Sequence, residues 1–500
     1  MTAQLNDCSR AVAEGGQRLQ ITMSPYYGES DFSGLDRSST RGARIDPVSL
    51  ADLLRNGFVY APHSIFEGIK LATFGFDPDH DMHLAPEFRF LFRDSEKSRE
   101  RGDPQTDWVG TYHRLLCNAV SNACTNMRSP WLLQSGGKDS TPLAIAAAET
   151  RPDTVCITYM GGNEENEVES ASLVASKLGL RHETLVCDPG RAYDRYLAIV
   201  DAMPLLTADF ALLSYVDLAT DILANGGDGI VDGMGADNYF GIPVHWQQKV
   251  LSWLARDVRL PRFVADLPVV SRSFQYCYLL STLQMNPVER SFPGSRFTDE
   301  EVDELLGRRD IACSSKARLA LFQSELSSAS NADEHFAMAL TVAGSSGGFA
   351  KGLYTAGALS LRVAYPFCDS DLREWVYRQV PPDQLLDPVT RTSKVLMRRY
   401  IATHFDKLPY VSRKGSFRYD LCGLARQRFE QVHACALQTR DVVPGAAAWL
   451  ERNRGRLDNK YHASKFYLLA VVLPWIASRQ RSDPPARDIP VPAARVNGWG

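Results

Sequence analysis

Short apolar runs alternate with helical patterns through the middle of the chain. Four runs have the length and composition of strands: 131–134, Thr154–Met160, Glu183–Cys187 and Gly229–Asp232. The stretches between them predict helices over Thr141–Glu149, Glu164–Leu178 and Phe210–Ala224, with glycines following the last two. This alternation predicts an α/β fold, a doubly wound parallel sheet with helices on both faces. In such sheets ligands bind at the carboxyl ends of the strands.

The pattern changes on both sides of this sheet region. Residues 1–45 have weak periodicity, and residues 94–106 form a charged stretch. From about 245 to 480 the chain is mainly helical, with a capping box at Thr298 and Glu301. The apolar run Tyr467–Ala477 predicts a buried helix that is too short to span a bilayer. We expect a truncated N-terminal region and linker over 1–105, one main domain over 106–480, and a disordered Pro-rich tail over 481–500.

Composition narrows the classes of function. The 500 residues carry a net charge of −4 without a long basic run, which argues against a nucleic-acid partner. The N-terminus lacks the charged and apolar regions of a signal peptide, so we expect no membrane partner. The ten cysteines include no Cys-x-x-Cys pair. Their spacing predicts neither a zinc site nor a redox pair, and it favours a cytoplasmic location.

The most informative segment is Leu-Leu-Gln-Ser-Gly-Gly-Lys-Asp-Ser at residues 132–140. Two glycines let the backbone turn tightly, and the following helix adds its N-terminal N–H groups, which predicts a phosphate site. Ser135, Gly136, Gly137 and Ser140 would bind a pyrophosphate, and Asp139 would hold Mg²⁺. The alternative is that Asp139 and Ser140 only cap the helix. The segment resembles the PP-loop of enzymes that split ATP between its α- and β-phosphates, and it lacks the Walker spacing.

A second loop follows the strand at 229–232, with the sequence Gly-Met-Gly-Ala-Asp-Asn-Tyr-Phe-Gly at residues 233–241. Glycines at a strand end with one carboxylate among them suit a second magnesium ligand, Asp237, beside Gly235. Many Gly/Asp loops are plain turns. The pairing of this loop with the one at 135–140 favours a shared nucleotide site.

Together these motifs resemble the synthetase domain of the asparagine synthetase and β-lactam synthetase family. The family pattern has Ser-Gly-Gly-x-Asp-Ser, then a Gly-x-Gly-Ser/Ala-Asp loop about a hundred residues later, an Arg-x-Pro-Phe-x-Asp segment, and two lysines twenty residues apart. This chain has Arg362–Asp369, with the arginine displaced by two, and Lys394 and Lys414. The resemblance covers about residues 45–480.

The resemblance implies an ATP-dependent carbon–nitrogen ligase with ATP and Mg²⁺ as cofactors, the metal being held by Asp139 and Asp237. A carboxylic acid would be adenylated with release of pyrophosphate, and ammonia or an amine would then displace AMP. Lys394 would hold the polyphosphate, and Lys414 would stabilise the charge that develops in the reaction. Thr158 and Tyr159, at the end of the second strand, fall where the family places adenine.

Two departures from the family pattern bear on the nitrogen source. Family members begin with a glutamine-hydrolysing domain whose nucleophile is a cysteine after Met1. Here that position is Thr2, and about 45 residues precede the joining segment, so we expect no glutaminase. Met234 stands where the family has a Glu or Tyr linked to deprotonating the amine, and Asn238 replaces a common glutamate.

Two other functions remain open. One is a PP-loop enzyme that modifies tRNA or transfers sulfur, for which a basic surface and paired cysteines would be expected. The other is a non-catalytic homologue that binds nucleotide, which Met234 slightly favours. The interpretation that accounts for both loops and both lysines is a glutamine-independent amide synthetase in specialised metabolism. The acid, the amine and the oligomeric state stay open.

Overall fold

The protein is described here by a computed structural model that covers residues 20–22, 40, 43–72, 107–161, 167–244, 246–254, 256–258, 260, 264, 267–292, 296–406 and 419–480. Its centre is a five-stranded parallel sheet in the order β5-β4-β3-β6-β7. The strands are β3 (Pro130–Leu133), β4 (Val155–Met160), β5 (Arg181–Val186), β6 (Gly229–Val231) and β7 (Arg362–Ala364). The predicted α/β fold with a parallel sheet is confirmed.

The central position of β3 in the sheet explains why its sequence is continuously apolar. All four of its residues are buried, because it has a strand on each side and helices over both faces. Leu132 lies opposite Cys156 of β4 and Val231 of β6. The strand order reverses at this point: β4 and β5 follow on one side of β3, and β6 and β7 lie on the other. Such a reversal is where doubly wound sheets bind their ligands.

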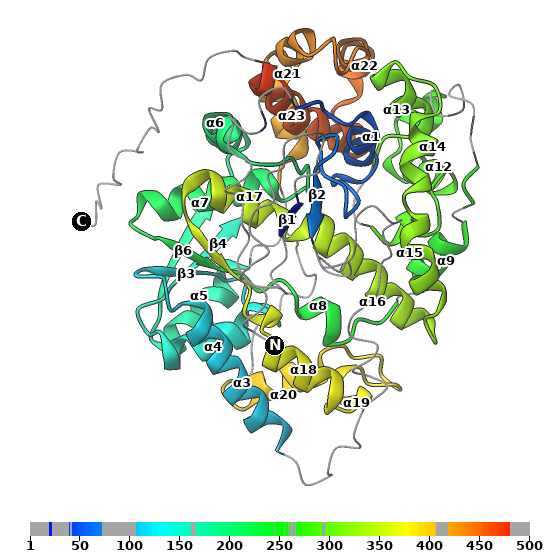
Figure 1. Ribbon diagram of the computed structural model, residues 1–500. Coiled ribbons are helices and arrows are strands. Elements are labelled where there is room, and N and C mark those ends of the chain that lie inside the picture. Colours follow the sequence, from blue (N-terminus) through cyan, green and yellow to red (C-terminus); the bar gives the residue numbers. More distant parts are fainter. Residues whose placement is uncertain are drawn as a thin grey trace.

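Helices cover both faces of the sheet (Figure 1). One group consists of α3 (Trp108–Ala123), α4 (Ser140–Thr150) and α5 (Val168–Leu178). The other consists of α6 (Pro189–Ile199), α7 (Leu212–Ala224) and α17 (Ala350–Leu359). The α4 helix is buried for most of its length, consistent with its run of alanines against the sheet.

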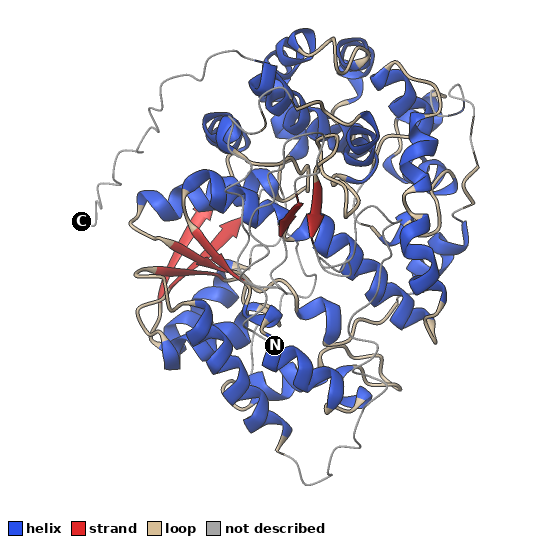
Figure 2. Cartoon of the chain, viewed as in Figure 1, coloured by secondary structure: helices blue, strands red, loops and turns tan. Residues whose placement is uncertain are grey.

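The rest of the described chain is almost entirely helical, as Figure 2 shows. Beside the sheet region, β1 (Gln20–Thr22) pairs in parallel with β2 (Lys70–Ala72). The helices here are α1 (Pro47–Asn56), α8 (Ala236–Tyr239), α9 (Trp246–Leu254), α11 (Pro268–Ser271), α12 (Phe274–Leu283), α13 (Asp299–Leu306), α14 (Ile311–Ala317), α15 (Ala320–Ser327), α16 (Ala332–Ala343), α18 (Ser370–Arg378), α19 (Pro382–Leu385), α20 (Val395–Ala402), α21 (Leu421–Gln438), α22 (Ala446–Asn453) and α23 (Lys460–Gln480).

Two local predictions in the helical part can be compared directly with the structure. The capping box is present: the Glu301 N–H donates to the Thr298 hydroxyl, and the Thr298 N–H donates to the Glu301 carboxylate. The predicted buried helix lies within α23, whose residues 461–478 are all buried. No helix of the described part of the chain is long and apolar enough to cross a membrane.

The sequence did not predict the fifth strand, β7. It is three residues long and pairs with β6, placing Arg362 opposite Gly229 and Ala364 opposite Val231. The remaining strand boundaries differ from the prediction by one or two residues, the usual uncertainty of helix and strand ends. The charged stretch at 94–106 and the tail at 481–500 lie outside the described residues.

Candidate active site

The loop between β3 and α4 closes on its own hydroxyl groups. The Ser135 N–H donates to the Ser140 hydroxyl at 3.1 Å, and the Gly137 N–H donates to the Ser135 hydroxyl at 3.3 Å. The two hydroxyls lie 3.2 Å apart. The loop therefore gathers polar hydrogens at the N-terminus of α4, where the helix dipole favours an anion. A phosphate group suits these donors.

Gly136 is held at the point where this loop meets α5. Its φ is +65°, and a Cβ built there would lie 2.5 Å from the Ser170 hydroxyl and 2.7 Å from the Ala171 nitrogen. The Ser170 hydroxyl in turn donates to the Gly136 carbonyl at 3.3 Å. Both the backbone conformation and the close approach require glycine here.

The second loop, after β6, packs directly against the first. A Cβ on Gly233 would lie 3.6 Å from the Cβ of Asp139. Gly235 has φ +103°, and a Cβ there would lie 3.0 Å from the sulfur of Cys368. Gly235 therefore lets the loop approach the Pro-Phe-Cys segment after β7. Asp369, at the end of that segment, caps α18 by accepting from two backbone N–H groups.

The two predicted magnesium ligands meet at one lysine. The Lys394 ammonium forms ion pairs with Asp139 and with Asp237. The lysine side chain is only 3% exposed, whereas Asp237 is half exposed. Lys394 has φ +57° and precedes the first residue of α20. A lysine in this sparsely populated conformation, buried between two carboxylates, is typical of a functional site.

These carboxylates fit the metal that the sequence analysis predicts for them. Asp139 and Asp237 each place one oxygen against the same nitrogen, so they are close enough to share one cation. Carboxylate oxygens are the ligands that Mg²⁺ takes from proteins, alongside water and substrate phosphates. The loop at residues 135–140 lies directly beside them. The donor set therefore fits Mg²⁺ bound together with a polyphosphate.

A buried lysine that the sequence analysis missed lies next to Met234 of the second loop. Lys351, in α17, donates to the Gly348 carbonyl at 2.7 Å and lies 3.0 Å from the Met234 sulfur. The Met234 N–H donates to Asp232 at 3.1 Å. Burial raises the pKa of the Asp232 carboxyl, and the charge of Lys351 opposes that rise. The signal that could have found this group is the glycine-rich run at 344–348, which forms a π-helix, a frequent feature of functional sites.

The two predicted adenine contacts lie at the end of β4. The Thr158 hydroxyl donates to the Gln134 carbonyl at 2.6 Å and lies 2.8 Å from His182 Nε2, so it is engaged within the sheet. The Tyr159 hydroxyl lies 3.4 Å from Asp217, to which it donates, and burial raises its pKa well above the usual value. Contacts from these residues to adenine would therefore come through backbone atoms or ring faces.

Lys414 lies outside the described residues, so its predicted role stays a prediction. The structure brings together the residues predicted from the two loops and Lys394: Ser135, Gly136, Gly137, Asp139, Ser140, Gly235, Asp237 and Lys394.

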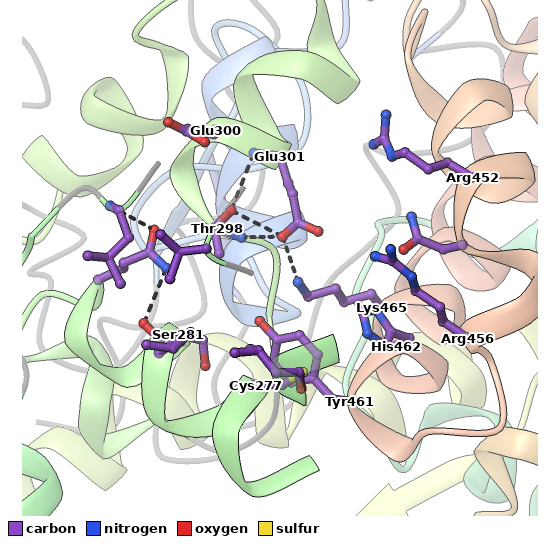
Figure 3. A pocket seen from close by; sticks show the side chains of 16 residues that line it. Cys277, Ser281, Thr298, Glu300, Glu301, Arg452, Arg456, Tyr461, His462 and Lys465 are labelled. Atoms are coloured by element: carbon purple, nitrogen blue, oxygen red, sulfur yellow. Dashed lines mark hydrogen bonds and ion pairs between the residues drawn. The ribbon is translucent and has the colours of Figure 1, made fainter. Parts of the chain in front are cut away.

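A separate small pocket lies between α12, α13 and α23 (Figure 3). Lys465 points from α23 to Glu301, which it contacts at 2.6 Å. Beside them, burial and then the charge of Lys465 lower the pKa of His462 to about 4. The cavity volume is about 50 Å³, far below the several hundred Å³ typical of nucleotide-sized ligand sites. The pocket is therefore no alternative to the site between the two loops.

Comparison with known proteins agrees with this geometry. The model of the asparagine synthase family matches residues 111–444, which is more than half of the chain and includes both loops and Lys394. A comparison with curated proteins gives no match. The family match, the parallel sheet and the paired loops at its switch point lead to one conclusion. The chain belongs to the asparagine synthase family, whose function in general is ATP-dependent amide synthesis.

Proposed function

We propose that this protein adenylates a carboxylic acid with ATP, releases pyrophosphate, and transfers the acyl group to ammonia or an amine without using glutamine. The observation that carries the proposal is the pairing of Lys394 with both Asp139 and Asp237. It ties together the loops that follow β3 and β6, at the reversal of strand order where a nucleotide would bind.

In the first reaction, a carboxylate oxygen attacks the α-phosphorus and the bond to the β-phosphate breaks. Two anions approach each other in this step, so the site must neutralise charge. The loop donors at Ser135, Gly137 and Ser140 would bind the pyrophosphate, with Gly136 and Gly235 allowing the two loops to approach. Mg²⁺ on Asp139 and Asp237 would add positive charge at the leaving pyrophosphate.

Lys394 would change partners when the nucleotide binds. In the structure, two carboxylates balance the positive charge of its ammonium group. Once those carboxylates hold a metal, the lysine would be released toward the phosphate oxygens, where we assign it to hold the polyphosphate. It is pre-positioned for this by its burial and by its fixed backbone conformation.

In the second reaction, the nitrogen attacks the acyl carbon and AMP leaves. We assign Lys414 to stabilise the negative charge of this step, and the backbone of Thr158 and Tyr159 to contact adenine. Met234 cannot accept a proton from the amine. Lys351 and Asp232 are the ionisable groups beside Met234, and we assign them to the amine side of the site. A divergent family member that uses no glutamine fits specialised metabolism better than asparagine supply, by analogy with the family.

The test is product analysis of Mg-ATP turnover over a panel of carboxylic acids, each with ammonia, simple amines, glutamine or no nitrogen source. Hydroxylamine serves as a general trap for an acyl-adenylate. Formation of AMP and pyrophosphate with one class of acid, and of an amide with ammonia or an amine, supports the proposal. Formation of ADP and phosphate would contradict the adenylate mechanism, and efficient use of glutamine would contradict glutamine independence.

The control pair is Asp139→Ala and Asp194→Asn. Asp139 is in the proposed site, whereas Asp194 forms an ion pair with Arg428 and is 56% exposed. Turnover should vanish in the first variant and persist in the second. ATP binding without turnover under every condition would instead favour the non-catalytic alternative.

A further inference from the structure

A group of metal-ligating side chains lies where α3 packs against the last turn of α4. His113 and Cys117 lie four residues apart on α3, so they face the same side of that helix. Glu149 lies in the last turn of α4. The ligand atoms of these three residues all lie within 4.8 Å of one another. Among the described residues, this is the one group of three or more His, Cys, Asp and Glu close enough to share a metal ion.

Two of the distances can be compared with those between ligands of a tetrahedral zinc ion. His113 Nε2 lies 3.2 Å from Glu149 Oε2 and 3.9 Å from Cys117 Sγ. Zinc bonds of about 2.0 Å to oxygen, 2.1 Å to nitrogen and 2.3 Å to sulfur place tetrahedral ligand pairs roughly 3.3 Å (N–O) and 3.6 Å (N–S) apart. The N–O distance fits, but Cys117 Sγ lies as close to His113 Nδ1 (3.8 Å) as to Nε2, so the thiol must rotate away from the ring to reach a metal on Nε2.

The other nitrogen of His113 is already oriented as metal-binding histidines require. His113 Nδ1 lies 2.9 Å from the Tyr400 hydroxyl, a buried group of α20. Metal-ligating histidines usually use their second nitrogen for such a bond, which fixes the ring and its tautomer. The Tyr400 contact thus leaves Nε2 directed at Glu149.

A candidate for the fourth ligand is His404, which lies outside the group of three. The His404 ring follows α20 and lies 6.4 Å from the His113 ring, centroid to centroid. Its Nδ1 lies 2.9 Å from the Thr403 hydroxyl, which leaves Nε2 for a metal. His404 is exposed, so its side chain can rotate toward the group.

We propose that His113, Cys117, Glu149 and His404 form a zinc site that joins α3, α4 and α20. The mixed set of thiolate, imidazole and carboxylate ligands suits Zn²⁺ better than Mg²⁺ or Ca²⁺, which prefer oxygen. The spacing of cysteines in the sequence pointed away from zinc, because three of the four ligands are not cysteines and two of them, Glu149 and His404, lie outside α3.

The site would hold together the two helices whose N-terminal ends carry the catalytic loop and lysine. Asp139 immediately precedes α4, and Lys394 immediately precedes α20. A metal clamp at the far ends of these helices would fix their relative position. It would therefore keep the Asp139–Lys394 pair in register without contacting ATP.

The test uses the full chain after removal of metals with a chelator. Titration with Co²⁺ should give one tight equivalent with tetrahedral d–d absorption and a thiolate-to-cobalt charge-transfer band, and Zn²⁺ should displace it. Cys117→Ser should abolish the charge-transfer band. Glu149→Gln, at an exposed position, should weaken Zn²⁺ binding by more than about tenfold, the size of effect seen even for outer-shell partners.

The matched control is Cys313→Ser, which removes an exposed cysteine outside the group. It should leave both the band and the affinity unchanged. Zn²⁺ should also raise the thermal unfolding midpoint of the wild-type protein and of the control, but not that of the Glu149→Gln variant at low metal concentration. Absence of tight binding to the wild type, or a charge-transfer band that persists in Cys117→Ser, would overturn the proposal.

Discussion

Replacing Gly136 by alanine tests whether the loop at residues 135–140 is fixed by its contact with α5. Two costs can be worked out from the structure. The residue has φ +65°, and a left-handed conformation costs a non-glycine residue roughly 1–2 kcal/mol. The added Cβ would also lie 2.5–2.7 Å from atoms of Ser170 and Ala171. One of these atoms is a backbone nitrogen, which no side-chain rotation can move, and such overpacking costs about 1–3 kcal/mol.

Gly179 provides the control that separates the two costs. It has φ +71°, and a Cβ built there meets nothing within 4 Å. Gly179→Ala should therefore lower the free energy of unfolding only by the backbone cost, roughly 1–2 kcal/mol. Gly136→Ala should lose about 2–5 kcal/mol in total. Adding Ser170→Gly to Gly136→Ala should recover part of the difference but not all, because the Ala171 nitrogen remains.

The assay is urea unfolding followed by circular dichroism, together with ATP binding at a concentration where each variant is folded. Gly136→Ala should bind ATP more weakly than Gly179→Ala, since the alanine pushes the loop away from α5. The reasoning fails if the two variants are equally stable and bind ATP equally well. That result would mean that the loop and α5 move apart at little cost.

The remaining predictions concern charged groups. Asp139→Asn and Asp237→Asn should each lower ATP turnover by about a hundredfold or more, as expected for loss of a group that organises transition-state charge. Their unfolding midpoints should stay near that of the wild type. Normal turnover in either variant would remove that residue from the site. Lys351→Met should destabilise the protein by about 1–3 kcal/mol, because the Gly348 carbonyl loses its donor, and a double-mutant cycle with Asp232→Asn should reveal coupling between the two sites. Burial is the main reason why the folded-state pKa of His462 is lowered from 6.5 to about 4. The neutral histidine therefore contributes about 3 kcal/mol to the free energy of unfolding above pH 6.5, and this contribution is lost as the pH falls toward 4. Urea unfolding at pH 7 and pH 4 measures this change, and His462→Gln should reduce it; an unchanged difference would contradict the assignment.

The sheet region could be predicted from the sequence because its signals are local. The inner strands β3 and β4 appear as mainly apolar runs, and the loop at 135–140 is a single contiguous motif. The strand β7 could not be predicted in the same way. It has only three residues, and its identity as a strand depends on β6, which lies more than a hundred residues earlier.

The residues of the candidate site also differ in whether a local sequence signal predicts them. The carboxylates could be predicted because each follows a strand in a glycine loop. Their shared partner, Lys394, could not be predicted from a local signal, because it pairs with residues 255 and 157 positions away in the sequence. Its part in the sequence analysis depended on the resemblance to a family. Lys351 was missed because its own position in a helix does not separate a buried lysine from an exposed one, and the only signal is the neighbouring glycine-rich run at 344–348.

The late position of β7 in the chain has a consequence for how the protein is synthesised. Until residue 364 has left the ribosome, β6 has no neighbour on one side and exposes an unpaired strand edge. Such an edge can pair with another chain. The helices between residues 236 and 361 are therefore synthesised before this edge is protected. We expect truncations that end between these strands to aggregate, and translation pauses in this interval to increase the demand for chaperones.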